Sequence, residues 1–318
     1  MTDTSPGMDA IISIGSPDRR EGAIAIQAHA RLTPKRASQL VSDGGTTDGL
    51  PLAVFARYLS ESTRARLRDL DVGYLDLTGN IRIILSKPGL VIETEGASVD
   101  PDRQQRPART LRGSKAGRIV RLLVDRKSPP GVREIAEAAS VDAGYVSRVL
   151  TLLDSEALIV RTGRGKIESV DWPALLRRWA TEAPLDSRGT GMTLLEPRGL
   201  SALLTKLADS NEHYVVTGGL AARTVAPVAP PRLATIWMRD ASDAAKRLNL
   251  RPAEAGANVL AIEPSDDSVF DGASERDGVR HAALSQVAAD LLTSPGRGPA
   301  EAEELIEWMI ANEEVWRR

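Results

Sequence analysis

A helix–turn–helix pattern at residues 131–150 constrains the fold of this chain more than any other sequence feature. The stretch reads GVREIAEAASVDAGYVSRVL. Asp142 is a good N-cap for the second helix, because its side-chain oxygen can accept a hydrogen bond from a backbone N–H of the first turn. Four apolar residues then follow at i, i+3, i+4 and i+7, namely Val146, Val149, Leu150 and Leu153. This spacing predicts a helix with one face in a core.

The same periodicity turns Tyr145, Ser147, Arg148 and Thr151 outward. An earlier helix is predicted from about residue 114 to 127. After the motif, residues 158–161 and 167–170 are predicted strands on either side of a Gly-Arg-Gly tip. Three helices and a hairpin are typical of a winged helix, so double-stranded DNA is the leading candidate partner. A winged helix that contacts proteins instead of DNA is the alternative.

The winged-helix interpretation gives each exposed side chain an expected role. The outward residues of the second helix of the motif, Tyr145, Ser147, Arg148 and Thr151, are expected in or beside the major groove. Arg164 and Lys166 at the hairpin tip are expected to reach the DNA backbone or the minor groove. Lys115 and Arg133 are expected to contact phosphates.

The net charge of −2 conceals a strong asymmetry along the chain. Residues 101–181 hold 16 Lys/Arg against 9 Asp/Glu, whereas residues 182–318 hold 14 against 21. Positive charge therefore coincides with the predicted winged helix, as binding to phosphates requires. A solvated basic face is the alternative explanation.

Composition excludes several classes of site. The chain has no cysteine and only three histidines, which excludes disulfides and thiolate ligands and disfavours a multi-histidine metal site. We expect no metal, no cofactor and a cytoplasmic location. No run approaches 18 consecutive apolar residues, so no membrane span is expected.

Residues 1–105 are predicted to form an α/β domain. The segments Tyr74–Asn80 and Val91–Glu95 hint at a restriction-endonuclease-like core, with Asp76 and Glu93 as candidate metal-binding acids. Active members of that class also need a lysine two residues after the second acid, and this chain has Glu95 there. A metal-dependent nuclease is therefore kept only as an alternative. The simpler hypothesis is that Asp76 and Asn80 fix a strand turn.

Residues 182–318 are predicted to form a second α/β domain. The sequence Thr217-Gly-Gly-Leu-Ala-Ala222 resembles the strand–turn–helix entry of nucleotidyltransferase-like domains, which place two carboxylates on the next strand to hold Mg²⁺. The next predicted strand, residues 232–239, contains no acid, and Asp240 follows its end alone. We therefore expect a degenerate domain that binds without catalysis. An ordinary helix entry is the alternative.

Taken together, these motifs resemble a family. The order is GYLDLTGN at residues 73–80, GYVSRVL at 144–150, TGGLAA at 217–222 and DLLTSPGRGPAEAEEL at 290–305. The chain resembles actinobacterial helix-turn-helix proteins grouped with abortive-infection type IV antitoxins (AbiEi-like). The resemblance implies a transcriptional regulator. Antitoxins of that group usually carry the winged helix at the N-terminus, whereas about 110 residues precede it here.

The sequence thus predicts an α+β multidomain protein that is not an enzyme. The expected domains are 1–105 (degenerate restriction-endonuclease-like), 106–181 (winged helix) and 182–318 (degenerate nucleotidyltransferase-like). The expected function is DNA-binding transcriptional regulation. The flanking domains would form a homodimer, sense a small-molecule effector or bind a protein partner. An antitoxin that neutralises a partner toxin is the second alternative beside the nuclease.

Overall fold

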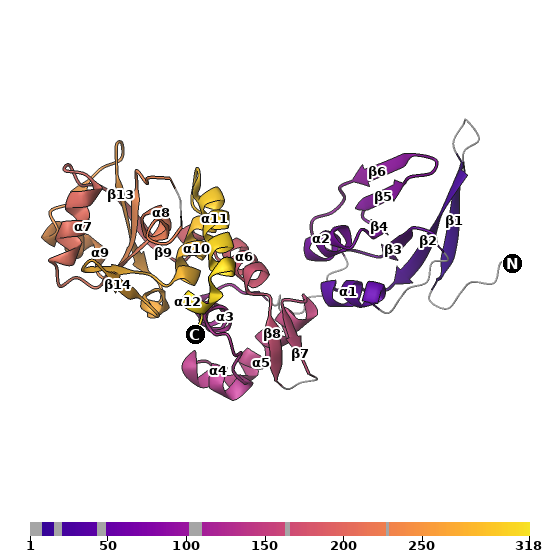
Figure 1. Ribbon diagram of the computed structural model, residues 1–318, viewed down its shortest axis with the longest axis horizontal. Helices are drawn as coiled ribbons and strands as arrows, with labels where there is room; N and C mark the ends of the chain where they lie inside the picture. The colour runs from indigo at the N-terminus through magenta and orange to yellow at the C-terminus, as the bar shows by residue number, and fades with distance from the viewer. Residues whose placement is uncertain (1–7, 16–20, 43–48, 102–109, 163–165, 227–228) are drawn as a thin grey trace. The chain divides into compact units, whose positions relative to one another are not determined.

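A computed structural model of the chain describes residues 8–15, 21–42, 49–101, 110–162, 166–226 and 229–318 (Figure 1). The fold is α+β with mixed sheets. The chain divides into two compact units. Unit 1 comprises residues 1–108 and 151–157, and unit 2 comprises residues 109–150 and 158–318. Among the helices in the described ranges, none combines the length and the apolar character needed to cross a bilayer.

Unit 1 is built on a six-stranded sheet whose strands lie in the order of the chain. The strands are β1 (Ala10–Gly15), β2 (Glu21–His29), β3 (Leu52–Ala56), β4 (Gly73–Asp76), β5 (Ile81–Leu85) and β6 (Leu90–Thr94). Strands β2, β3 and β4 are parallel, and the remaining pairs are antiparallel. Apolar runs bounded by turn residues in the sequence predict strands at 24–30, 52–58, 72–77, 81–85 and 90–95, and Ser60 or Ser62 as a helix cap. Strands β2 to β6 lie at these places, whereas β1 was not predicted.

Two helices connect the parallel strands of unit 1, as parallel pairing requires. They are α1 (Pro34–Ser42) and α2 (Glu61–Asp69). Ser60 caps α2, because its hydroxyl accepts a hydrogen bond from the Thr63 N–H at 3.2 Å. Apolar residues of both helices pack with Val54, Ala56 and Tyr74 of the sheet in one core cluster. A second cluster, which includes Ile24, Ile26 and Ile83, contains residues of the sheet alone.

Unit 2 begins with the region in which a winged helix was predicted. Its elements are α3 (Ser114–Asp125), α4 (Val132–Ala138), α5 (Ala143–Ser155), β7 (Ile159–Arg161) and β8 (Ile167–Val170), although the part of α5 from residue 151 onward is counted with unit 1. Residues 114–170 are called the central segment below. Strands β7 and β8 are antiparallel. Asp171 then caps α6 (Trp172–Glu182), since its side chain accepts a hydrogen bond from the Ala174 N–H at 3.2 Å.

The remainder of unit 2 contains a seven-stranded mixed sheet in the order β12-β9-β13-β11-β10-β15-β14. The strands are β9 (Gly189–Leu195), β10 (Tyr214–Thr217), β11 (Ala234–Met238), β12 (Arg251–Pro252), β13 (Val259–Pro264), β14 (Ser274–Arg276) and β15 (Val279–His281). Every residue of β10 and β11 is buried. This explains their nearly uninterrupted apolar sequences.

Helices lie on both sides of this sheet in Figure 1, with α7 and α9 on one side and α8, α10 and α11 on the other. Their bounds are α7 (Leu200–Ala208), α8 (Gly218–Ala222), α9 (Ala241–Arg247), α10 (Leu284–Leu292), α11 (Gly298–Ala311) and α12 (Glu313–Trp316). Two 3₁₀ turns, η1 (Leu185–Ser187) and η2 (Asp267–Phe270), complete the unit.

The predicted boundary at residue 181 does not separate compact units. Helices α3 and α6 contact each other, and both contact α10. The contacting faces are apolar: Ile119 and Leu123 of α3 and Leu175 and Leu176 of α6 are fully buried. The central segment therefore shares its packing with the C-terminal sheet and helices.

Candidate nucleic-acid interface

Asp142 caps the N-terminus of α5, as the sequence predicted. The Asp142 Oδ1 atom accepts a hydrogen bond from the Tyr145 N–H at 3.0 Å. Val146, Val149, Leu150 and Leu153 are all buried, so the predicted core stripe is confirmed. The cap and the stripe together fix which face of α5 remains outside the core.

The outward face of α5 carries the four polar residues expected there. Ser147, Arg148 and Thr151 are exposed, and Tyr145 is half-buried. The Arg148 guanidinium lies over the Tyr145 ring, 5.7 Å from the ring centroid. Burial raises the pKa of Tyr145, although the nearby Arg148 acts to lower it. The Tyr145 hydroxyl is therefore neutral at physiological pH and can donate and accept hydrogen bonds.

The other predicted cations occupy separate elements of the central segment. Lys115 lies in the first turn of α3, Arg133 in the first turn of α4, and Lys166 directly before β8. All three are exposed, and none is ion-paired with another residue of the part that the structure describes. The fifth predicted cation, Arg164, lies outside the described residues.

A second group of cations in and beside the central segment is engaged with the rest of unit 2. Arg118 forms a bidentate contact with Asp266, in which Nε lies 3.1 Å from Oδ1. Arg177 of α6 binds Glu303 in the same way, with Nε 3.0 Å from Oε1. Lys127 pairs with Glu314. These acids are between 126 and 187 residues away along the chain.

The positive charges of residues 101–181 therefore fall into two groups. Part of the positive charge of residues 101–181 meets acidic residues that follow residue 182. Four other cations, Lys115, Arg133, Arg148 and Lys166, are exposed, and none of them forms an ion pair within the described residues. Sequence reasoning missed this division, because no local pattern distinguishes Arg118 from Lys115.

In unit 1, Asp76 has its oxygens occupied by hydrogen bonds. Oδ1 accepts from the Thr78 N–H at 2.8 Å, the Thr78 hydroxyl at 2.7 Å and the Asn80 N–H at 3.2 Å. Oδ2 accepts from the Leu59 N–H at 3.0 Å and from Asn80 Nδ2 at 2.9 Å. Burial acts to raise the pKa of Asp76, but these hydrogen bonds outweigh it and the pKa is lowered. The carboxylate fixes the turn after β4, as the simpler hypothesis proposed.

Glu93 does not join Asp76. It is exposed on β6 and pairs with Arg82 of β5, which in turn pairs with Tyr74 of β4. Two strand spacings, roughly 10 Å, therefore separate Glu93 from the strand that carries Asp76. Two carboxylates that hold one metal ion must lie much closer than this. Nowhere in the described ranges do three or more acidic or histidine side chains gather as metal ligands would.

In the C-terminal part of unit 2, the Thr217-Gly-Gly sequence does lie between a strand and a helix, β10 and α8, with β11 antiparallel to β10. Strand β11 carries Thr235 and Trp237 but no acid. The carboxylate that reaches this strand belongs to Asp290 of α10, which is fully buried.

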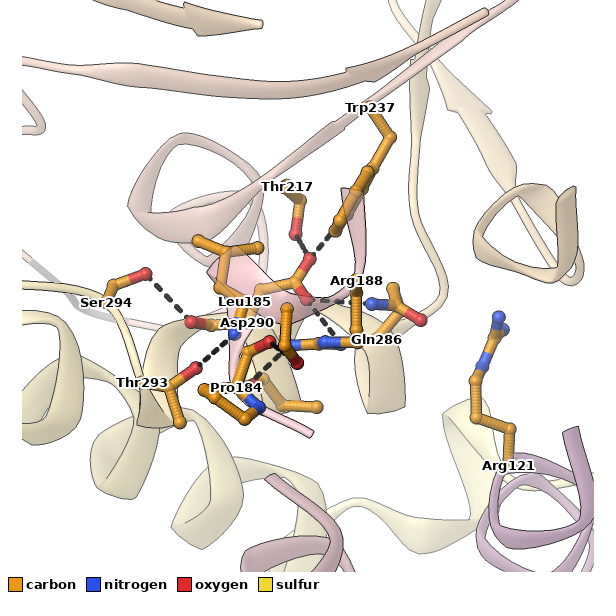
Figure 2. Close-up of polar contacts among 12 residues, drawn as sticks. Arg121, Pro184, Leu185, Arg188, Thr217, Trp237, Gln286, Asp290, Thr293 and Ser294 are labelled. Carbon is orange, nitrogen blue, oxygen red and sulfur yellow. Dashed lines mark hydrogen bonds and ion pairs between the residues drawn. The ribbon is translucent and has the colours of Figure 1, made fainter. Parts of the chain in front are cut away.

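Figure 2 shows Asp290 at the centre of a polar network. Oδ2 accepts hydrogen bonds from the Thr217 hydroxyl and from Trp237 Nε1, both at 2.7 Å. Oδ1 accepts from Gln286 Nε2 at 2.7 Å and lies 2.8 Å from the Arg188 guanidinium. Burial lowers the pKa of Arg188, and Asp290 opposes that shift. The network joins β10, β11, α10 and the segment before β9, so its role is to hold the fold together.

The glycines of the same motif face a side chain of the protein itself. A Cβ atom placed on Gly219 would lie 2.6 Å from Glu301 Oε2 of α11. The Glu301 carboxylate therefore lies against the first turn of α8. Sequence reasoning did not single out Asp290 or Glu301. Both lie in the 290–305 segment of the family resemblance, and the local signal for Asp290 was an acid after the apolar run VAA of the helix sequence LSQVAADLL.

Comparison of the chain with protein families, with curated proteins and with solved structures found no match. The geometry above therefore carries the functional argument.

Proposed function

We propose that the central segment is a winged helix that binds double-stranded DNA and that the protein is a transcriptional regulator. The observation that supports this proposal best is that some cations of the central segment are paired within unit 2, whereas others are exposed and have no ion pair in the described residues. Arg148, with Tyr145 beside it, lies on the outward face of α5. Lys115, Arg133 and Lys166 are exposed on three other elements of the same segment. An exposed helix face among unpaired cations suits a duplex, because base edges and phosphates are contacted together.

In this proposal α5 is the recognition helix. Arg148 has the side chain that reads guanine in the major groove, where one bidentate contact contributes about 1–3 kcal/mol of discrimination. Ser147 and Thr151 offer hydroxyl groups to bases or phosphates. Lys115, Arg133 and Lys166, together with Arg164, which lies between β7 and β8 in the sequence and outside the described residues, supply the sequence-independent attraction to phosphates.

We further propose that the flanking folds recognise rather than catalyse. Three observations support this part of the proposal. The carboxylate oxygens of Asp76 are occupied by hydrogen bonds, Glu93 lies two strands away from the strand of Asp76, and β11 contains no acidic residue. A Mg²⁺- or Mn²⁺-dependent cleavage assay with Asp76→Asn as the control tests it. Cleavage that is lost in the variant would establish the nuclease alternative instead.

DNA binding is tested by fluorescence anisotropy of the full chain with genomic fragments over a salt series. We expect Arg148→Ala to weaken binding to the best fragment by about tenfold to a hundredfold and to reduce the preference over other fragments. Lys166→Ala should weaken binding to all fragments alike and lower the salt slope by about one. Arg251→Ala, which removes an exposed arginine from β12, is the matched control and should change neither quantity.

Two outcomes would contradict the proposal. One is the absence of any complex at low salt. The other is an equal loss of affinity in Arg148→Ala and Arg251→Ala, because charge alone, and not the α5 face, would then account for binding.

A further inference from the structure

Unit 2 contains a cavity of about 680 Å³ between the central segment and the C-terminal sheet and helices. Its wall includes Arg121 of α3, Ala139 after α4, Arg276 of β14, Trp308 of α11 and Trp316 of α12. This volume lies within the range of cavities that bind small organic ligands. The proposed DNA-binding face is on α5, so the cavity is a separate feature.

The wall of the cavity is richer in cations than in anions. Its arginines are Arg118, Arg121, Arg126, Arg276, Arg317 and Arg318, and its acids are Asp125, Asp271 and Glu314. Several of these charges are paired with residues outside the wall, such as Arg118 with Asp266 and Glu314 with Lys127. Two arginines of the wall lack a close counter-ion: Arg121, whose ion pair with Asp125 is 3.7 Å long, and Arg276, for which no ion pair is found in the described residues.

Arg121 is a buried cation with incomplete partners. It is 4% exposed. Its terminal nitrogens donate to the backbone carbonyls of Ser268 and Asp271, and the nearest carboxylate oxygen, on Asp125, is 3.7 Å away. Its Nε–H has no hydrogen-bond partner in the described structure. A buried charge normally has a close counter-ion and satisfied donors, because its desolvation is costly.

Arg276 lines the same cavity and lies on the β14–β15 hairpin. Its guanidinium donates to the carbonyl oxygen of Thr224 at 2.5 Å, and no carboxylate in the described part of the chain forms an ion pair with it. Trp308 and Trp316, with Leu122, Leu284 and Val287, make other parts of the wall apolar. The wall therefore combines guanidinium groups with aromatic and aliphatic surface.

We propose that this cavity binds a small organic anion with an aromatic or apolar body. The guanidiniums of Arg121 and Arg276 bind its acidic group, and the tryptophan-containing wall packs against its body. An acidic group in the cavity would place a negative charge near Arg121, whose nearest carboxylate oxygen is 3.7 Å away, and would accept charge-assisted hydrogen bonds from Arg276. The proposal does not depend on DNA binding, since it concerns a different surface of unit 2.

Two fluorescent probes that differ by one charged group test the proposal on the full chain. 1-Anilinonaphthalene-8-sulfonate has an aromatic body and an acidic group, and N-phenyl-1-naphthylamine has the same body without it. We expect saturable binding of the sulfonate at least about tenfold tighter than binding of the neutral probe.

Variants then locate the site. Arg276→Gln should reduce the preference for the sulfonate severalfold, because Arg121 remains, and should leave binding of the neutral probe unchanged. Arg280→Gln, which removes an exposed arginine from the same hairpin but outside the cavity wall, should retain the preference. Ser274→Glu adds a negative charge to an exposed position of the wall and should reduce sulfonate binding by a similar factor.

Three outcomes would overturn the proposal: no saturable binding of the sulfonate, equal affinity for both probes, or equal losses in Arg276→Gln and Arg280→Gln. Circular dichroism of each variant confirms that the fold is retained, as expected because all three substituted side chains are exposed.

Discussion

At the scale of single residues, two buried carboxylates hold loops and strands in place through hydrogen bonds. Asp76 in unit 1 accepts hydrogen bonds within its own turn and from Leu59, 17 residues away, and Asp290 in unit 2 accepts from Thr217 and Trp237, 73 and 53 residues away. Acids in such sites attract a catalytic interpretation when only the sequence is known. Their hydrogen-bond partners show that both are engaged by the protein itself.

Replacing Asp76 should destabilise unit 1 alone. Asp76→Asn removes the charge that five donors share, and we expect a loss of about 3 kcal/mol in the free energy of unfolding. All five tryptophans lie after residue 171. The unfolding transition followed by circular dichroism should therefore begin at a lower urea concentration, whereas the transition followed by tryptophan fluorescence should keep its midpoint. Glu93→Gln, at an exposed position, is the control and should cost less than about 0.5 kcal/mol.

The effect of Asp76→Asn should also depend on pH. Because the pKa of Asp76 is lowered in the folded state, its contribution is complete above the unfolded value of about 3.9 and is lost as pH falls through the folded pKa. The difference in stability between the native chain and the variant should therefore shrink below about pH 4. A difference that grows as pH falls would be inconsistent with the hydrogen-bonding pattern of this carboxylate.

At the scale of elements, the start of α5 depends on one local hydrogen bond. Asp142→Ala removes the acceptor of the Tyr145 N–H and should cost about 1 kcal/mol. Asp142→Ser keeps an oxygen at the cap and should recover most of that loss. Urea unfolding followed by tryptophan fluorescence measures both variants. If the serine variant is as unstable as the alanine variant, the cap is not what stabilises this helix.

At the scale of the whole molecule, the central segment and the C-terminal part should unfold as one cooperative unit, because α3 and α6 pack on α10. Asp290→Asn leaves Arg188 without its carboxylate and should cost about 3–5 kcal/mol. It should shift the same single fluorescence transition that Asp142→Ala shifts. Asp186→Asn, at an exposed position two residues before Arg188, should shift it little. Two separate tryptophan transitions would show that residue 181 is a true boundary.

Local structure was predictable from local sequence. The cap at Asp142, the stripe from Val146 to Leu153, the cap at Ser60 and strands β2 to β6 are each encoded within a few neighbouring residues. Strand β1 was missed, although its sequence AIISIG is rich in β-branched residues. The outward position of Arg148 followed from the helical period, whereas the cavity beside Arg121 and Arg276 left no sequence signal.

The sequence by itself determined the helices, the hairpin, the outward face of α5 and the absence of acids on β11, because periodicity, capping and composition act over a single element. Only the tertiary structure decided which charges are available. It placed Asp266 against Arg118 from 148 residues away and left Lys115 exposed on the same helix. It also brought Asp290 to Thr217 and Trp237. Such partners meet only when the chain folds, so no pattern within one element can reveal them.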